Sequence, residues 1–236
     1  MYAADNQGVL VLNPDGPDGG TFRKPSWAGG WLDFTGWDST NILGLKRGFD
    51  DYPSRQFSGL LGTYLTDASV YKCPEDKSTA TISGKKLPRV RSVSMNAYMG
   101  GIQIHNSNLL NTWVSTRFEV YSRKSSFLNV SPSQLFVFIE EKAESINDGC
   151  FNMDMVSAID PSRQLTPGKF RIVDYPAGYH ENGAALSFAD GHAELWQWKD
   201  PRTILSVKPN ETMVINNSSA DNADIGRLAV ATSRPK

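Results

Sequence analysis

The sequence has no excess of charge of one sign and no long apolar run. It holds 24 Lys and Arg residues against 25 Asp and Glu residues, and no stretch gathers like charges. A nucleic-acid-binding surface or a membrane-surface patch would need a basic face, so neither partner is expected. No apolar stretch approaches the roughly 20 residues of a membrane span, and no signal peptide is present.

Cysteine and the common catalytic signatures are also scarce. The two cysteines, Cys73 and Cys150, do not belong to a CxxC pair, which argues against a zinc knuckle. Two interpretations stay open for them: one disulfide in an oxidising compartment, or two buried thiols. The sequence contains no nucleophile elbow and no HExxH motif, and neither cysteine has an activating base near it in the sequence.

The residues that are present predict one α+β domain spanning residues 1–236. Hydrophobic residues make up 39% of the chain, which is ample for a packed core. The apolar spacing predicts an amphipathic helix over 56–65, strands over 89–101 and 134–141, a hairpin over 184–198 and a closing helix over 222–232. Strands follow one another with turns between them, which is typical of an antiparallel sheet.

The hairpin over 184–198 carries Asp190-Gly191 at its centre, the favoured sequence for a two-residue type I′ turn. That turn would pair Phe188 with Ala193. One face of the hairpin is then predicted to be core, namely Leu186, Phe188, Ala193 and Leu195. The opposite face would carry Ser187, His192, Glu194, Trp196 and Trp198, and we expect another part of the chain to cover it.

Tryptophans in a glycine-rich N-terminal segment allow two interpretations. The residues concerned are Trp27, Trp31 and Trp37, to which Trp196 and Trp198 of the hairpin are added. They could belong to a loop folded over the edge of the core, which is the favoured interpretation. Alternatively, they could form a stacking platform for the sugar rings of a polysaccharide, and the chain would then be a carbohydrate-binding surface protein.

Several stretches, in order along the chain, resemble one family of bacterial prepilin-type proteins. In residues 179–203, nine residues lie between His180 and Asp190-Gly191, and the family is named for this H-x9-DG spacing. Residues 58–76 resemble the family's helix and Cys-Pro-acid turn, 89–101 its Arg-Ser and Met-Asn strand, and 132–151 its strand ending in paired acids. Residues 1–10 resemble the end of the N-terminal pilin helix, and 223–228 the closing helix.

The resemblance implies a pilin-like fold, in which the remnant of a truncated N-terminal helix (residues 1–8) packs on an antiparallel sheet with long loops. It implies prepilin-type cleavage and methylation after a basic leader, and a hydrophobic helix that anchors the full-length protein in the inner membrane before assembly. The implied role is a non-enzymatic, pseudopilin-like subunit of a type II secretion-like pseudopilus or a cell-surface pilus. Its partners would be other pseudopilin subunits and secretion-system components, in the periplasm or at the cell surface, where a disulfide is favoured.

The residues that carry the family motif are His180, Asp190, Gly191, Glu141 and Asp148. The sequence departs from the family in one place, because Glu140-Glu141-Lys142 stands where Asp-Glu-His is expected. Lys142 cannot act as a ligand as a histidine would.

Three hypotheses for the polar residues remain. In the favoured one, they form a structural network, with His180 bonded to a carbonyl or to Asp190. In the second, they bind a metal through His180, Asp190 and His192, or hold structural calcium through Asp221 and Asp224. In the third, a hydrolase uses His180, Asp190 and a carboxylate between 141 and 148.

Overall fold

The computed structural model describes residues 1–14, 26–46, 59–101, 114–206, 208, 211, 213 and 216–236, and they form an α+β fold as predicted. A five-stranded sheet lies at the centre, in the order β5-β3-β4-β7-β8. Its strands are β3 (Val93–Asn96), β4 (Phe136–Glu140), β5 (Cys150–Phe151), β7 (Gly183–Phe188) and β8 (Ala193–Gln197). The pairs are antiparallel except β3 with β5, which is parallel. The strands predicted over 89–101 and 134–141 are therefore confirmed.

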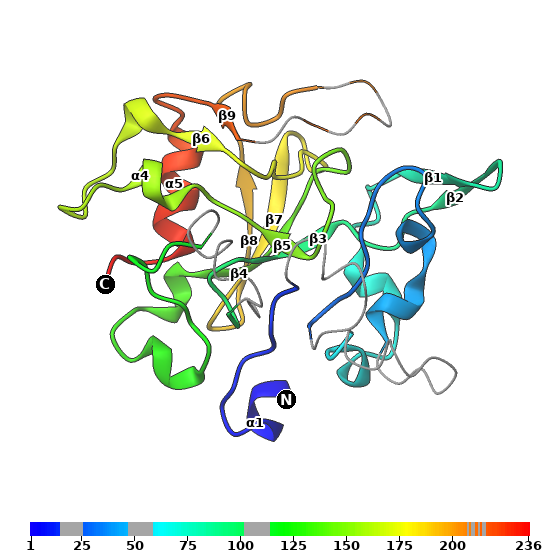
Figure 1. Ribbon diagram of the computed structural model, residues 1–236, viewed down its shortest axis with the longest axis horizontal. Helices are drawn as coiled ribbons and strands as arrows, with labels where there is room; N and C mark the ends of the chain where they lie inside the picture. The colour runs from blue at the N-terminus through cyan, green and yellow to red at the C-terminus, as the bar shows by residue number, and fades with distance from the viewer. Residues whose placement is uncertain are drawn as a thin grey trace.

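Two smaller sheets and several short helical turns surround the central sheet (Figure 1). β1 (Thr79–Ile82) and β2 (Lys85–Pro88) form a projecting hairpin, and β6 (Arg171–Ile172) pairs with β9 (Asn217–Ser218). α4 (Met155–Ala158) is one turn long. The 3₁₀ turns are Trp37–Thr40, Ile42–Leu45, Gly62–Tyr64, Ala68–Tyr71, Lys124–Phe127, Pro132–Gln134 and Pro167–Lys169.

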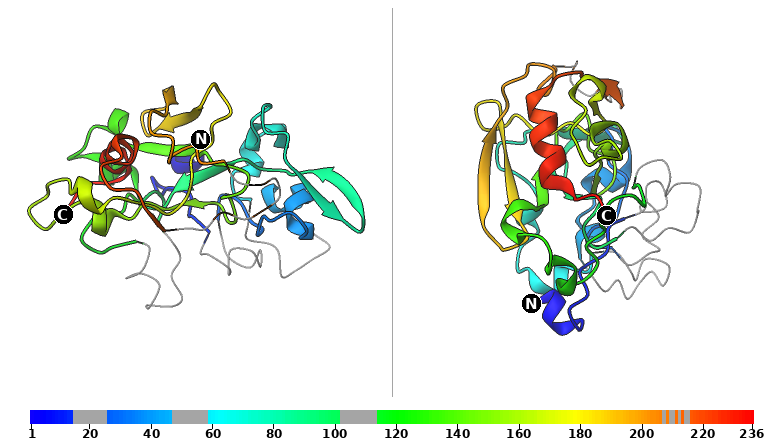
Figure 2. Two further views of the ribbon diagram at one scale, coloured as in Figure 1. Left: turned by 90° about the horizontal axis from the view of Figure 1, so that it is seen from above. Right: turned by 90° about the vertical axis from the view of Figure 1, so that its left-hand side faces the viewer.

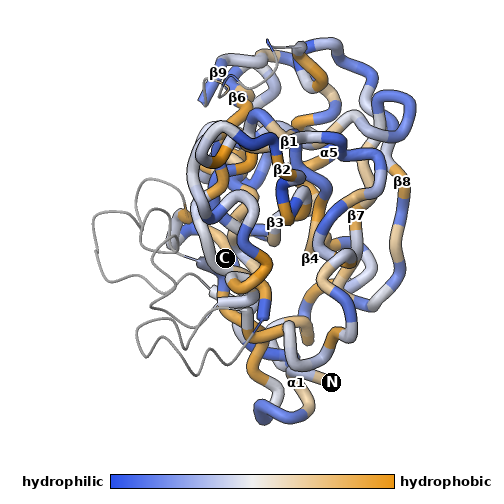
Figure 3. Tube along the Cα trace, turned by 90° about the vertical axis from the view of Figure 1, so that its right-hand side faces the viewer, coloured by the Kyte–Doolittle hydropathy of each residue, from blue (hydrophilic) through white to orange (hydrophobic). Residues whose placement is uncertain are grey.

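The sheet separates two apolar clusters. On one face α5 (Ala223–Thr232) lies over β7 and β8 (Figure 2), and its Ile225 and Leu228 are buried in the same cluster as Trp196 and Trp198. On the other face the N-terminal half packs a second cluster that includes Trp27. Figure 3 shows the consequence, since the central β4 is hydrophobic along most of its length whereas the edge strand β8 is mixed. The predicted closing helix is confirmed.

α1 (Tyr2–Asp5) lies at the lower end of the molecule in Figure 1, away from the sheet. None of its residues is buried, and Tyr2 makes an edge-to-face contact with Tyr64 at 5.8 Å between ring centroids. The helix that covers one face of the sheet is α5, whereas α1 contributes only Tyr2, at the margin of the second cluster, so the pilin-like packing of residues 1–8 on the sheet is not confirmed. Within the described part of the chain, no helix is both long enough and apolar enough to span a membrane.

The amphipathic helix predicted over 56–65 does not form in the part that the structure describes. Residues 56–58 lie outside the described residues, and beyond them only Gly62–Tyr64 is helical, as a 3₁₀ turn. Gly59 has a φ of +70°, and a Cβ at this position would lie 2.7 Å from the Leu45 carbonyl carbon. A left-handed residue in close backbone contact interrupts an α-helix, although the apolar spacing favours one.

The hairpin of β7 and β8 is confirmed, but its predicted register is wrong. Ser187 pairs with Ala193, and the loop between them holds three residues besides Phe188 and His192. Gly191 alone of the Asp190-Gly191 pair has a positive φ, +97°, so the turn is not type I′. The shift moves β8 by one residue, so that Leu195 is 54% exposed while Trp196 is buried beneath α5.

Candidate functional site

Three of the motif stretches meet beside the end of β4. Glu140 is the last residue of that strand, opposite Val93 of β3, and its Oε2 accepts a hydrogen bond of 2.8 Å from the Ala185 N–H of β7. Cys73, from the Cys-Pro-acid turn, is fixed by its own N–H, which donates to Ser92 Oγ at 2.8 Å. Both side chains are buried.

A tight turn brings His180 to the same place. Glu181 and Asn182 have φ values of +50° and +67°, and His180 and Gly183 exchange backbone hydrogen bonds of 2.9 and 3.1 Å. Two left-handed residues between a doubly bonded pair make a type I′ turn, the type predicted for Asp190-Gly191. Gln197 Nε2 also donates to the His180 carbonyl at 3.0 Å, which ties the turn to β8.

The imidazole of His180 contacts a carboxylate and a thiol through one nitrogen. Its Nε2 lies 3.1 Å from Glu140 Oε2, 3.2 Å from Glu140 Oε1 and 3.4 Å from Cys73 Sγ. These three residues offer ligand atoms that all lie within 4.8 Å of one another. Across the described part of the chain, no other group of three His, Cys, Asp or Glu residues meets this condition. We refer to Cys73, Glu140 and His180 as the CEH cluster.

The CEH cluster is not arranged as a nucleophilic triad. In such a triad the acid bonds to one ring nitrogen and the nucleophile to the other, whereas here both groups contact Nε2. Burial, with the adjacent Glu140 carboxylate, raises the pKa of the Cys73 thiol to about 11, so the thiol is protonated at neutral pH. A nucleophilic cysteine needs the opposite shift. The cluster is better suited to hold a cation among three donors.

Cys73 and Glu140 line a cavity of about 1120 Å³. Its wall includes Lys72 and Asp76, whose side chains approach each other to 3.5 Å. Lys72 Nζ also donates to the Arg89 carbonyl at 2.8 Å, which fixes the Lys72 ammonium group at the wall of the cavity. The cavity gives solvent and small ions a route to two members of the CEH cluster.

The motif residues Glu141 and Asp148 belong to a buried framework, separate from the CEH cluster. Glu141 Oε1 accepts from Ser145 Oγ at 2.8 Å, and Asp148 Oδ1 accepts from the Cys150 N–H at 2.7 Å. Arg91 donates to the Asp148 carbonyl at 2.8 Å. Burial raises the pKa of Glu141 and lowers that of Arg91 to about 10. Glu140 and Glu141 thus serve different sites, because neighbouring residues of an extended chain point to opposite faces of the sheet.

Asp190 and Gly191 lie at the opposite end of the hairpin from His180 and contact His192 instead. His192 Nδ1 lies 2.5 Å from Asp190 Oδ1, and its ring stacks on Phe188 at 4.4 Å between centroids. The hydrogen bond to Asp190 raises the pKa of His192. The structure does not bring His180, Asp190 and His192 together as a metal site. It does not bring His180 and Asp190 together as a hydrolase site either. Lys142 takes no part either, since its Nζ lies 3.9 Å from Glu144.

The calcium site predicted from Asp221 and Asp224 is also not assembled. Asp224 is buried, and its Oδ2 accepts from the backbone N–H groups of Lys199 and Asp200 at 2.9 and 2.8 Å. Asn222 Oδ1 accepts from the Asp224 and Ile225 N–H groups, so it is the N-cap of α5. This segment therefore uses its oxygens to cap backbone donors.

The two cysteines are both buried and reduced, so the disulfide is not formed. Cys73 belongs to the CEH cluster, whereas Cys150 lies in β5 within the core that α5 covers. The interpretation as two buried thiols is the one that agrees with the structure.

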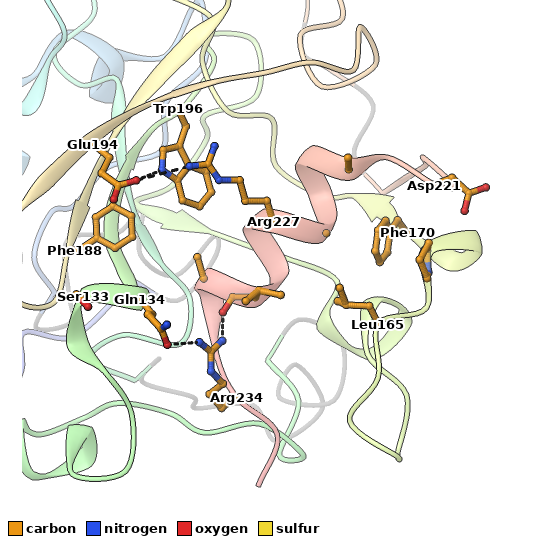
Figure 4. A pocket seen from close by; sticks show the side chains of 15 residues that line it. Ser133, Gln134, Leu165, Phe170, Phe188, Glu194, Trp196, Asp221, Arg227 and Arg234 are labelled. Atoms are coloured by element: carbon orange, nitrogen blue, oxygen red, sulfur yellow. Dashed lines mark hydrogen bonds and ion pairs between the residues drawn. The ribbon is translucent and has the colours of Figure 1, made fainter.

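The predicted tryptophan platform is largely buried. Trp27 and Trp198 donate their indole N–H groups to the carbonyls of Gly149 and Ala177 in the interior. In the groove of about 760 Å³ beside α5, the Arg227 guanidinium lies 3.5 Å from the centre of the Trp196 ring (Figure 4). That face is therefore not free to stack on a sugar, and of the five tryptophans only Trp31, half-buried, and Trp37, 48% exposed, remain.

Sequence reasoning missed two members of the CEH cluster. Cys73 was considered for a disulfide or as a buried thiol, and Glu140 as one of the paired acids that end the strand over 134–141. Both lie in motif stretches that resemble the prepilin-type family, and this shared membership was the available signal. No local sequence pattern links Cys73 to His180, because the two residues are 107 positions apart in the sequence.

Comparison with known proteins gives no relative for this chain. No protein-family model matches the sequence, and neither the curated proteins nor the solved structures include a match.

Proposed function

We propose that this chain is the globular domain of a pseudopilin-like subunit, with a structural role in a type II secretion-like pseudopilus or a cell-surface pilus. In this role the domain contacts other subunits and secretion-system components in the periplasm or at the cell surface. The full-length protein is held in the inner membrane by an N-terminal hydrophobic helix until assembly.

One observation carries the proposal: the stretches that resemble the prepilin-type family make direct contacts with one another inside the fold. Cys73, Glu140 and His180 come from three stretches and form one cluster. Arg91, from a further stretch, bonds to the Asp148 carbonyl, which follows the paired acids. Residues that recur together in a family because they build one framework are expected to lie in contact. This supports a common fold, and hence the family's structural role.

The interior position of these motif residues also favours a structural role over catalysis. Glu141 and Arg91 are fully buried, where Glu141 accepts from Ser145 Oγ and Arg91 donates to the Asp148 carbonyl. α1 supports the proposal in a second way, since it lies at one end of the molecule with Met1 87% exposed. A preceding helix could continue from this end without displacing the core.

The proposal is tested by processing of the native gene product. The gene is expressed with its own upstream sequence in cells that contain a prepilin peptidase, and in matched cells that carry an inactive peptidase. We expect a shorter, N-terminally methylated product only in the first cells, with cleavage between a basic leader and an apolar helix. The proposal would be overturned by a secretory signal cleaved directly before this domain, with no hydrophobic helix retained.

A further inference from the structure

We propose that the CEH cluster is a zinc site, in which Cys73 Sγ, His180 Nε2 and Glu140 Oε1 bind one Zn²⁺ and solvent from the adjoining cavity supplies a fourth ligand. This inference does not depend on the pseudopilin role. It rests on the geometry of the three donors, on the groups that hold them and on the cavity beside them.

The distances between the donor atoms match those of a tetrahedral zinc site. Zinc lies about 2.3 Å from sulfur and about 2.0 Å from nitrogen or carboxylate oxygen, so tetrahedral angles place sulfur about 3.6 Å from nitrogen and nitrogen about 3.3 Å from oxygen. The structure has 3.4 Å between Cys73 Sγ and His180 Nε2, and 3.2 Å between His180 Nε2 and Glu140 Oε1. A shift of a few tenths of an ångström would accommodate the ion.

The contacts within the cluster suit a bound cation. Nε2 lies close to both the thiol and the carboxylate, so the nitrogen lone pair, the sulfur and Oε1 can all face one ion. A zinc ion at the centre of the three donors satisfies all of them at once. The thiolate and the carboxylate then neutralise its charge, which lowers the free-energy cost of burying the ion.

Each ligand is oriented by a backbone contact that leaves its binding atom available. Glu140 Oε2 accepts from the Ala185 N–H, which fixes the carboxylate beside His180 and leaves Oε1, 3.2 Å from Nε2, available for a metal ion. Cys73 is held through its N–H by Ser92 Oγ. His180 sits on a turn closed by two hydrogen bonds to Gly183. Such outer contacts are what fixes the ligands of protein metal sites.

The donor set and the cavity indicate zinc with one open position. Sulfur, imidazole nitrogen and a single carboxylate favour zinc over calcium or magnesium, which prefer oxygen ligands. Three protein ligands leave the fourth tetrahedral position to a non-protein group. Cys73 and Glu140 line the cavity of about 1120 Å³, so that position is open to water.

The test is metal binding by the 236-residue chain. The purified protein is stripped with chelator, dialysed, and titrated with Zn²⁺ or Co²⁺. We expect one equivalent to bind, and the cobalt form to show a thiolate-to-metal charge-transfer band. Cys73→Ser should lose this band and weaken zinc binding by at least about 100-fold, beyond the range typical of changes to outer contacts. Cys150→Ala and His192→Ala are the matched controls, and both should bind as the wild type does.

Further variants keep the test decisive if Cys73→Ser does not fold. The His180 side chain is 32% exposed, so His180→Ala should stay folded by circular dichroism and still lose tight zinc binding. Glu140→Gln should weaken binding while retaining the thiolate band. The proposal is wrong if the wild type takes up no zinc, if its cobalt form lacks the thiolate band, or if folded His180→Ala binds zinc as tightly as the wild type.

Discussion

Cys73 Sγ lies 3.4 Å from His180 Nε2, across 107 residues of sequence. The contact joins the Cys-Pro-acid turn to the histidine of the H-x9-DG motif, with Glu140 as the third member. It gives His180 a role distinct from that of Asp190, although the motif names the two together. His180 acts at the open end of the hairpin near β4, whereas Asp190 orders the closing turn at the other end through His192.

The Gly100-Gly101 pair after β3 provides a stability test with a built-in control. Both residues have left-handed φ values, +72° and +76°. A Cβ on Gly100 would lie 1.8 Å from the Val11 carbonyl oxygen, whereas a Cβ on Gly101 would meet only Val120 Cγ1, at 3.7 Å. Gly101→Ala should cost about 1–2 kcal/mol of unfolding free energy, and Gly100→Ala at least about 3 kcal/mol because the backbone must also move. Equal losses in chemical denaturation would contradict the packing of the N-terminal segment on this turn.

Local patterns allowed much of the fold to be predicted, because strand alternation and helix capping depend on neighbouring residues. β4, the β7–β8 hairpin and α5 are examples. The register of the hairpin was missed because Asp190-Gly191 suits both a two-residue turn and a longer loop with one left-handed glycine. The helix over 56–65 was overpredicted because apolar spacing ignores the contact that Gly59 makes with Leu45. The CEH cluster could not be derived locally, since its members meet only through the sheet.

The titration of His192 should reveal its ion pair with Asp190 in the hairpin turn. The hydrogen bond from Nδ1 to Asp190 raises the pKa of His192 above 6.5. The stability contributed by this pair is therefore complete below the pKa of histidine in the unfolded chain and is lost as the pH rises through the folded value. Asp190→Asn should lower the pKa of His192, as measured by the chemical shifts of its ring protons. An unchanged pKa in that variant would show that the contact is absent in solution.

Burial of Glu141 should make the fold less stable at alkaline pH. Burial raises the pKa of this carboxyl, so the folded state keeps a proton that the unfolded chain releases above its ordinary pKa. Stability is then lost as the pH rises from that ordinary value through the raised one, by up to about 1.4 kcal/mol per pH unit. Glu141→Gln removes the effect, so its stability relative to the wild type should grow between pH 5 and pH 8 in urea denaturation. Parallel stability curves for the two proteins would contradict a protonated Glu141.

The segment before α5 should respond to mutation but not to calcium. Asp224→Asn removes the charge that accepts from the Lys199 and Asp200 N–H groups and from Thr203 Oγ1, which should cost about 1–3 kcal/mol. Asp221→Asn, at an exposed residue, should change the unfolding free energy little. Calcium should leave the Tm of the wild type unchanged. A rise in Tm with calcium that Asp224→Asn abolishes would restore the calcium hypothesis.

The central claim is that His180 binds a metal ion together with Cys73 and Glu140, and zinc-edge X-ray absorption of the zinc-loaded chain tests it most directly. The account predicts one sulfur neighbour at about 2.3 Å and the remaining neighbours, nitrogen or oxygen, at about 2.0–2.2 Å. The sulfur neighbour should be absent in Cys73→Ser and present in Cys150→Ala. A wild-type spectrum that contains only nitrogen and oxygen neighbours would contradict the claim.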